Sequence, residues 1–245
     1  MSEPAILFNS VELYKNGWGL LKQVWKPMLK VVLVYFLIEI LAQASLDFVE
    51  KQDSMLLQLL ISGVSLILSV ILQSGITAVS LRLVRDKTAE ISDLFAQKQI
   101  WVNYFLAMLA YQLIILLGLI LFIVPGIYWA LKYSLVLYLI VDKKVGVSEA
   151  FSLSGKMTQG ILWKLIGFGL LSVLLNLGGL LALGVGVFVT MGITVLAYVL
   201  LYEQLLTRIQ SNPAVAAVPM TSATPPTVPQ SETLPTPTEP PTVKL

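Results

Sequence analysis

The chain has 245 residues, of which 57% are hydrophobic and only 12% are charged, and its formal net charge is +2. Soluble domains carry about 25% charged residues, so this shortfall predicts a lipid-embedded chain rather than a soluble one with a large core. The sequence contains no cysteine and no histidine. This excludes disulfides, thiolate metal sites and cysteine nucleophiles, and it removes the commonest general base. The sequence also has no acidic cluster at metal-ligand spacing and no Gly-rich phosphate loop, so we expect no cofactor and no metal site.

Residues 1–27 are too polar to span a membrane. From Ser10, a good helix N-cap, their leucines, Val24 and Trp25 fall mainly on one helical side, with lysines among the polar positions. Two interpretations stay open for this segment. It is either an amphipathic helix in the membrane interface, with lysines toward anionic headgroups, or a helix packed on the rest of the bundle.

Crossing a hydrocarbon layer of about 30 Å takes about 20 apolar residues in a helix. Six stretches meet or nearly meet this length: about 28–46, 57–81, 102–124, 126–141, 161–181 and 184–206. The turn dipeptide Pro125-Gly126 separates the third from the fourth, and a glycine-rich stretch separates the fifth from the sixth. For residues 28–206 we predict an all-α fold, a polytopic bundle of six transmembrane helices with interfacial amphipathic helices beside it.

Basic residues are distributed unevenly between the two ends of these stretches. Of the sixteen Lys and Arg, fourteen lie before the first stretch, around the two long connections near 82–101 and 142–164, or after the last. At the other ends of the six stretches the only basic residue is Lys51, between the first and the second stretch. The remaining one, Lys132, lies inside the fourth stretch. Because cytoplasmic loops carry the excess of Lys and Arg, this bias predicts that both termini are cytoplasmic.

Residues 211–245 have a different composition. They hold nine of the twelve prolines, together with many Thr and Ser. Such a segment cannot bury a core, so we predict a disordered tail with polyproline II character. The spacing of Pro226 and Pro229 suits a proline-reading protein partner, and a plain solvated tail is the alternative.

Two of the predicted hairpins share a glycine pattern. Gly118 is followed eight residues later by Gly126, and Gly178 is followed at the same spacing by Gly186. Each hairpin also follows an acidic amphipathic stretch, at 92–95 and 148–151. We predict an internal repeat of an interfacial helix and a transmembrane hairpin, with a fainter first copy near the N-terminus.

Two ionisable residues lie inside predicted spans. Glu39 is nine residues after Lys30, and Lys132 is eleven residues before Lys143, which is about 14 Å and 16 Å along a helix. Charged groups at bilayer depth are costly and are functional-site candidates by default. Their similar depth leads us to predict that Glu39 and Lys132 pair.

A polar stripe runs along the second span. Its members are Ser62, Ser65, Ser69, Gln73, Thr77 and Ser80. Steps of three and four residues keep them on one helical face, which should point into the bundle. The last two spans add Ser172, Asn176, Thr190, Thr194 and Tyr198. These groups either join helices by hydrogen bonds or, in the case of the stripe, line a wet groove closed by Glu39 and Lys132.

The connection between the fourth and fifth spans has a recognisable order of residues. Val141-Asp142 leads to Glu149-Ala150 and Ser154, and then to Thr158, Gly160, Trp163 and Leu165. This order resembles the membrane domain associated with glycerophosphoryl diester phosphodiesterases and its uncharacterised bacterial relatives. The match covers about residues 115–206, and Met191 stands where relatives often have proline.

The resemblance implies a six-helix protein of the bacterial inner membrane. It does not imply phosphodiesterase activity, which belongs to a separate soluble barrel that this chain has no room for. The resemblance assigns no catalytic residues within the membrane domain, so it implies none in this chain. We therefore expect the chain not to be an enzyme.

Two functions stay open at this point. The first is a non-catalytic structural, lipid-interacting or envelope-organising module, and the second is a transporter or channel for a small polar solute through the groove of the second span. Membrane lipids are the expected partners in either case. Nothing indicates a nucleic-acid partner, and a homo-oligomer is compatible with the sequence.

Overall fold

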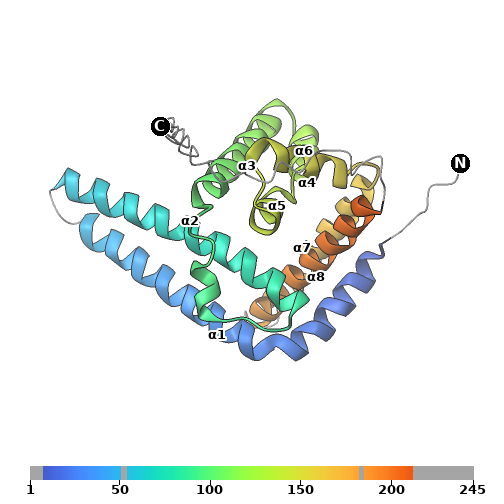
Figure 1. The fold of residues 1–245 in the computed structure, drawn as a ribbon, viewed down its shortest axis with the longest axis horizontal. Helices are drawn as coiled ribbons and strands as arrows, with labels where there is room; N and C mark the ends of the chain where they lie inside the picture. The colour runs from blue at the N-terminus through green and yellow to red at the C-terminus, as the bar shows by residue number, and fades with distance from the viewer. Residues whose placement is uncertain (1–7, 51–53, 182–184, 212–245) are drawn as a thin grey trace, which may run out of the picture.

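The computed structural model describes residues 8–50, 54–181 and 185–211, and within these ranges the chain is helical and contains no strand. The helices are α1 (Ser10–Glu50), α2 (Met55–Arg85), the 3₁₀ helix η1 (Ile91–Phe95), α3 (Trp101–Leu121), α4 (Ile123–Lys132), α5 (Val136–Lys143), α6 (Val147–Met157), α7 (Leu162–Leu181) and α8 (Val185–Gln210). Figure 1 shows their arrangement. The predicted disordered tail lies outside the described residues from position 212 onward.

Six helical segments in the described part are long and apolar enough to cross a membrane, with α4 and α5 counted together as Ile123–Lys143. This confirms the six apolar segments that the sequence predicts. In the most apolar window of each segment, between 6% and 39% of the residues are buried inside the protein. Many of the other apolar side chains on these helices are exposed, as lipid-embedded helices require.

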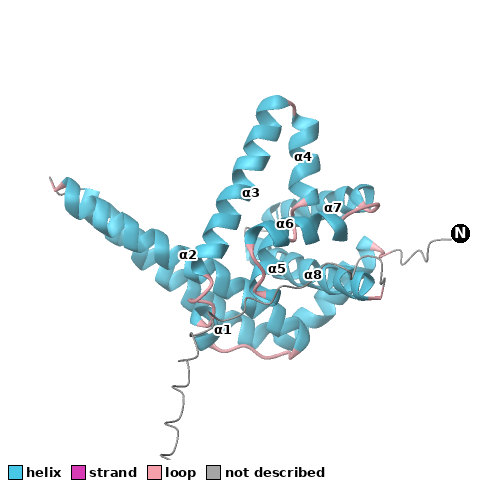
Figure 2. Ribbon diagram, turned by 45° about the horizontal axis from the view of Figure 1, so that its top comes forward, coloured by secondary structure: helices cyan, strands magenta, loops and turns pink. Residues whose placement is uncertain are grey.

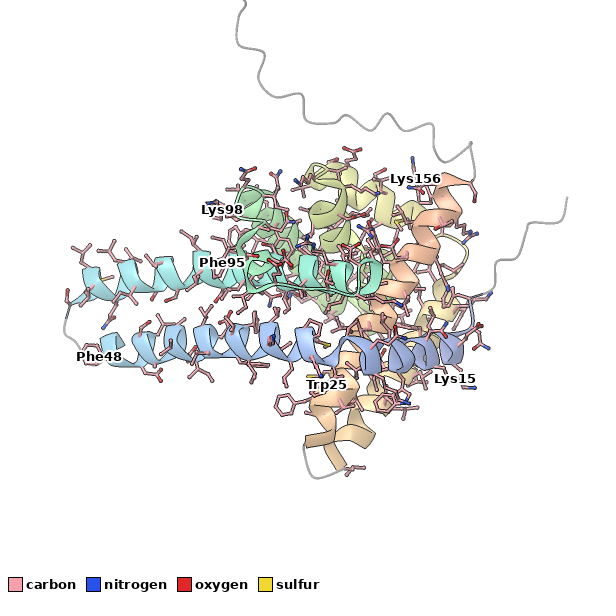
Figure 3. All side chains as sticks on the ribbon, turned by 60° about the horizontal axis from the view of Figure 1, so that its bottom comes forward. Lys15, Trp25, Phe48, Phe95, Lys98 and Lys156 are labelled. Carbon is pink, nitrogen blue, oxygen red and sulfur yellow. The ribbon has the colours of Figure 1, made fainter. Side chains whose placement is uncertain are left out.

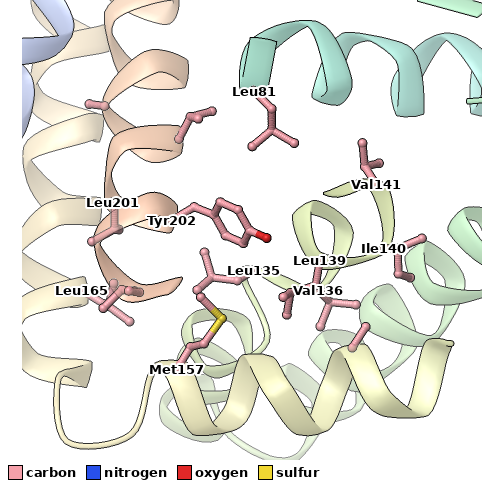
Figure 4. Close-up of a cluster of buried hydrophobic side chains, with 14 of the residues drawn as sticks. Leu81, Leu135, Val136, Leu139, Ile140, Val141, Met157, Leu165, Leu201 and Tyr202 are labelled. Atoms are coloured by element: carbon pink, nitrogen blue, oxygen red, sulfur yellow. The ribbon is translucent and has the colours of Figure 1, made fainter. Parts of the chain in front are cut away.

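Three helical hairpins, α1–α2, α3–α4 and α7–α8, diverge from a common region, and Figure 2 shows α1–α2 and α3–α4 running in different directions. Their inner ends meet around the short helices α5 and α6. Buried apolar side chains of α5 and α8, among them Leu139, Ile140, Leu201 and Tyr202, form the centre of this meeting point, which we call the hub (Figure 4). Figure 3 shows Phe48 at the far end of the α1–α2 hairpin, away from Lys15, Lys98 and Lys156.

Helix α1 joins two segments that the sequence analysis separates at residue 27. It continues through Pro27 and is bent between its two halves (Figure 1), as expected where proline removes one helical hydrogen bond. The first half packs on α8: Leu13 and Val24 are buried, and a side chain at Gly17 would lie 3.1 Å from the Ile193 carbonyl oxygen. The structure therefore shows this segment packed on α8, and its position in the membrane interface stays a prediction.

The turn between α3 and α4 lies at Phe122, whose backbone is extended, and not at Pro125-Gly126 as predicted. Pro125 is the third residue of α4, where the helix has no internal acceptor for its missing N–H. Gly126 lets the two helices approach closely, because a side chain at Gly118 would lie 2.7 Å from the Gly126 Cα. Gly126, which we expected in the turn, thus allows α3 and α4 to pack closely at Gly118.

The α7–α8 hairpin closes in a similar way but through a different glycine. A side chain at Gly179 would lie 2.9 Å from the Gly186 carbonyl oxygen, whereas Gly178 has open space around it. The predicted repeat aligns Gly178 with Gly118, so the contacts of the two hairpins are offset by one residue. The internal repeat itself stays a prediction.

Candidate functional site

The structure does not bring Glu39 and Lys132 together. Glu39, half-buried in α1, accepts a hydrogen bond from the Ser69 hydroxyl of α2 at 3.2 Å. Lys132 ends α4, and its Nζ lies 5.6 Å and 5.5 Å from the ring centroids of Tyr128 and Tyr133. The predicted ion pair is therefore wrong: within the described ranges the two charges belong to separate hairpins with separate partners.

The depth assigned to Lys132 assumed one continuous helix to Lys143, and the structure interrupts that helix. The Lys132 carbonyl accepts hydrogen bonds from the Ser154 and Thr158 hydroxyls at 2.9 Å and 3.0 Å. The Leu135 N–H donates to the Ser154 hydroxyl at 3.3 Å, and the Tyr198 hydroxyl donates to the Ser134 carbonyl at 3.2 Å. Side chains of α6 and α8 thus satisfy the backbone groups that the interruption frees, as buried irregular backbone requires.

This interruption places Lys132 beside the C-terminal turn of α6. A hollow of about 390 Å³ opens there between α4, α6 and the start of α7. Its polar lining residues are Tyr128, Lys132, Tyr133, Ser152, Lys156, Thr158 and Gln159. We call it the Lys132 hollow. Sequence reasoning found Lys132 but not the hollow, because the partners come from a helix that folds back along α5.

The polar stripe of α2 divides into two parts. In the outer part Ser62 is exposed, Ser65 is buried and Ser69 binds Glu39. In the inner part Thr77 lies 3.4 Å from the Tyr104 hydroxyl, and the Ser80 hydroxyl donates to the Thr77 carbonyl at 2.7 Å.

Gln73, between the two parts, is exposed, and its carbonyl accepts from Thr77 at 3.0 Å. Ser80 also borders a hollow of about 210 Å³ that is lined mostly by apolar side chains of α1, α2 and α8. The stripe residues that form hydrogen bonds therefore bond either to backbone carbonyls of α2 or to side chains of α1 and α3. This favours the interpretation that the stripe joins helices by hydrogen bonds and does not line a wet groove.

The polar groups of α7 and α8 hold that hairpin together. The Asn176 side chain donates to the Thr194 hydroxyl at 3.0 Å and accepts from the Thr190 hydroxyl at 3.0 Å. Ser172 is hydrogen-bonded to the Tyr14 hydroxyl, which ties the first half of α1 to α7. These side chains act as interhelical hydrogen bonds of the kind expected inside membranes.

A cluster of charges at the hub was not predicted. Arg85 at the end of α2 forms ion pairs with Asp142 of α5 and with Glu203 of α8, the latter at 2.7 Å. Asp142 also accepts a hydrogen bond from the Tyr202 hydroxyl at 2.8 Å and lies 3.4 Å from the Lys143 Nζ. The cluster joins three helices that are far apart in the sequence. We call it the Arg85 cluster.

A second ion pair fixes η1 on the hub. Arg82 of α2 pairs with Asp93, whose other carboxylate oxygen accepts the Glu90 N–H at 2.9 Å. Leu94 of η1 is fully buried against α2. The acidic stretch 92–95 that we predicted to be amphipathic is thus a short 3₁₀ helix clamped on α2.

Searches against family models, curated proteins and solved structures found no match to this chain. The resemblance to the phosphodiesterase-associated membrane domain is therefore not tested by them. It stays a prediction that rests on the residues of the α5–α7 connection.

Proposed function

We propose that the chain is a non-catalytic integral membrane protein that interacts with lipid and organises the membrane around it. The observation that carries this proposal is the exposure of apolar side chains along all three hairpins, where no more than 39% of any spanning window is buried. Lipid is the solvent that such surfaces favour, because exposing them to water costs about 25 cal/mol for each Å². In the hub, by contrast, the apolar side chains are buried against one another.

We propose further that the hub faces the cytoplasm of a bacterial cell, at its inner membrane. The charged residues Arg82, Arg85, Lys143, Lys156 and Arg208 lie near the hub ends of the helices. The positive-inside rule then favours cytoplasmic positions for both termini. The hairpin tips would point toward the periplasm.

The residues that carry the family resemblance support a structural role. Asp142 holds Arg85, while Ser154 and Thr158 hold the Lys132 carbonyl. Gly160 adopts a positive φ of 79° at the turn into α7, a conformation that glycine adopts without strain. We propose that the chain belongs to this family of membrane domains and that the shared residues build the hub rather than perform catalysis.

Extraction of membranes with alkaline carbonate tests the proposal. We expect the chain to stay in the membrane pellet, because its hairpins are held by apolar surface and not by charge. Release into the supernatant, as for a peripheral protein, would contradict it. Transport is tested separately, with flux of a small polar solute into proteoliposomes. Flux that is lost in Lys132→Ala but kept in Lys98→Ala would replace our proposal by the transporter alternative.

A further inference from the structure

The Lys132 hollow carries two ammonium groups, and its lining residues include no carboxylate. Lys132 comes from α4 and Lys156 from α6, and neither forms an ion pair with another residue of the described part of the chain. Two unpaired positive charges around one hollow repel each other, and an anion between them relieves that repulsion. The volume of about 390 Å³ lies within the range of small-molecule sites.

Lys132 is held in place by its surroundings. Its carbonyl accepts hydrogen bonds from Ser154 and Thr158, and its Nζ lies over the rings of Tyr128 and Tyr133, where cation–π attraction helps to hold the side chain in position. A preorganised charge loses less conformational entropy when an anion binds.

The position of the hollow along α7 points to the kind of anion. Leu162, which lines the hollow, is the first residue of α7, and α7 has 20 residues, the length that spans one hydrocarbon layer. Trp163 beside it is 85% exposed, and tryptophan is enriched at the level of lipid headgroups. A ligand in the hollow therefore meets the layer in which lipid phosphates lie.

We propose that the Lys132 hollow binds the phosphate group of an anionic lipid from the same leaflet. Lys132 and Lys156 neutralise the phosphate charge, and Tyr128 and Gln159 offer hydrogen-bond donors from the lining. The acyl chains lie along the exposed apolar residues of α4 and α7, such as Ile127 and Leu170. This site rests on the proposed function, because it requires the hairpins to be in the membrane.

Thermal stability of the purified chain in a neutral detergent tests the site. Dioctanoyl phosphatidylglycerol, dioctanoyl phosphatidylcholine and inorganic phosphate are titrated separately. Near one hundred times the dissociation constant we expect phosphatidylglycerol to raise the apparent Tm by about 5–10 °C, with saturation. Phosphatidylcholine and inorganic phosphate at the same concentrations should leave it nearly unchanged. Saturation by inorganic phosphate with the same shift would overturn the assignment to a lipid.

Variants locate the effect in the hollow. Lys132→Gln and Lys156→Gln should each raise the half-saturating concentration of phosphatidylglycerol by about tenfold, and Lys132→Arg should keep most of the binding. Lys98→Gln, an exposed lysine outside the hollow, is the matched control and should bind as the wild type does. An equal loss in Lys98→Gln would mean that diffuse charge attracts the lipid.

Lys156 is exposed, so its variant should fold even if Lys132→Gln does not. Two results together would overturn the site: Lys156→Gln binds phosphatidylglycerol as the wild type does, and Lys132→Arg binds it no better than Lys132→Gln. If the chain stays in the carbonate pellet while phosphatidylglycerol has no more effect than phosphatidylcholine, the headgroup site fails and the proposed function stands. Release of the chain by carbonate contradicts the proposed function itself.

Discussion

Replacing Gly75 by alanine should destabilise the protein, although Gly→Ala in a helix ordinarily stabilises it. Gly75 lies where η1 crosses α2, and a Cβ built there would lie 2.6 Å from the Leu94 Cα and 2.5 Å from its carbonyl carbon. These are backbone atoms, so no side-chain rotation relieves the overlap. The 3₁₀ helix has to move away from α2 to admit even one methyl group.

The size of the loss in stability follows from the contacts that this movement of η1 disturbs. Helix propensity favours alanine by about 1 kcal/mol. Against this, Leu94 is fully buried, and partial exposure of such a side chain costs up to about 1.5–3 kcal/mol, to which overpacking adds about 1–3 kcal/mol. The Arg82–Asp93 pair adds little because Arg82 is 52% exposed on its side chain. The net cost is about 2 kcal/mol, or about 4–8 °C in Tm for a chain of this size.

The assay is the fraction of a fluorescent fusion that stays monodisperse on size exclusion after heating in a mild detergent. Gly63→Ala is the matched control on the same helix, since Gly63 has open space around it. The control should match or exceed the wild type. If Gly75→Ala is as stable as Gly63→Ala, the close packing of η1 on α2 is refuted.

Three further predictions use the same assay. Gly179→Ala should lower the Tm and its neighbour Gly178→Ala should not, since only the former meets the facing helix; equal effects would contradict the observed hairpin contact. Arg85→Gln leaves the buried Asp142 carboxylate without its ion-pair partner on α2 and should cost about 1–2 kcal/mol. The exposed control Gln204→Ala should be neutral, and a neutral Arg85→Gln would show that the cluster does not hold the hub. Ser154→Ala removes a donor from the Lys132 carbonyl and the acceptor of the Leu135 N–H and should cost about 1–3 kcal/mol; an unchanged Tm would mean that the Ser154 hydroxyl does not stabilise the interruption.

The six apolar segments could be predicted from the sequence because each needs nothing beyond its own composition and length. At residue 27 the structure has one continuous, bent helix where the sequence analysis separates two segments. Pro27 removes one N–H donor, but α1 continues because its first half is held on α8 by buried residues such as Leu13 and Val24. Such tertiary packing is not visible in a local pattern.

The candidate site was predicted less well, since depth in a membrane does not say which helices are neighbours. Glu39 and Lys132 were matched by counting residues along straight helices. The fourth span is interrupted after Lys132, and the groups that stabilise the interruption, Ser154 and Thr158, are more than twenty residues away in the sequence. No periodicity in the fourth span indicates that break.

The Arg85 cluster was missed for a related reason. Asp142 and Glu203 are separated from Arg85 by 57 and 118 residues, and each of the three is an ordinary charge at the end of an apolar stretch. One signal was present: Asp142 belongs to the pattern that carries the family resemblance. Its partner on α2 could have been sought among the basic residues that end the second span.

Labelling of single engineered cysteines with a membrane-impermeant maleimide tests the membrane topology most directly, and the absence of native cysteine gives a clean background. Suitable exposed positions are Ser54 and Phe122 at the hairpin tips and Glu90 and Ser148 near the hub. In intact cells whose outer membrane is permeabilised, the variants Ser54→Cys and Phe122→Cys should react. The variants Glu90→Cys and Ser148→Cys should react only after the inner membrane is opened. Reaction of either hub variant before that step would contradict a six-span chain with its hub in the cytoplasm.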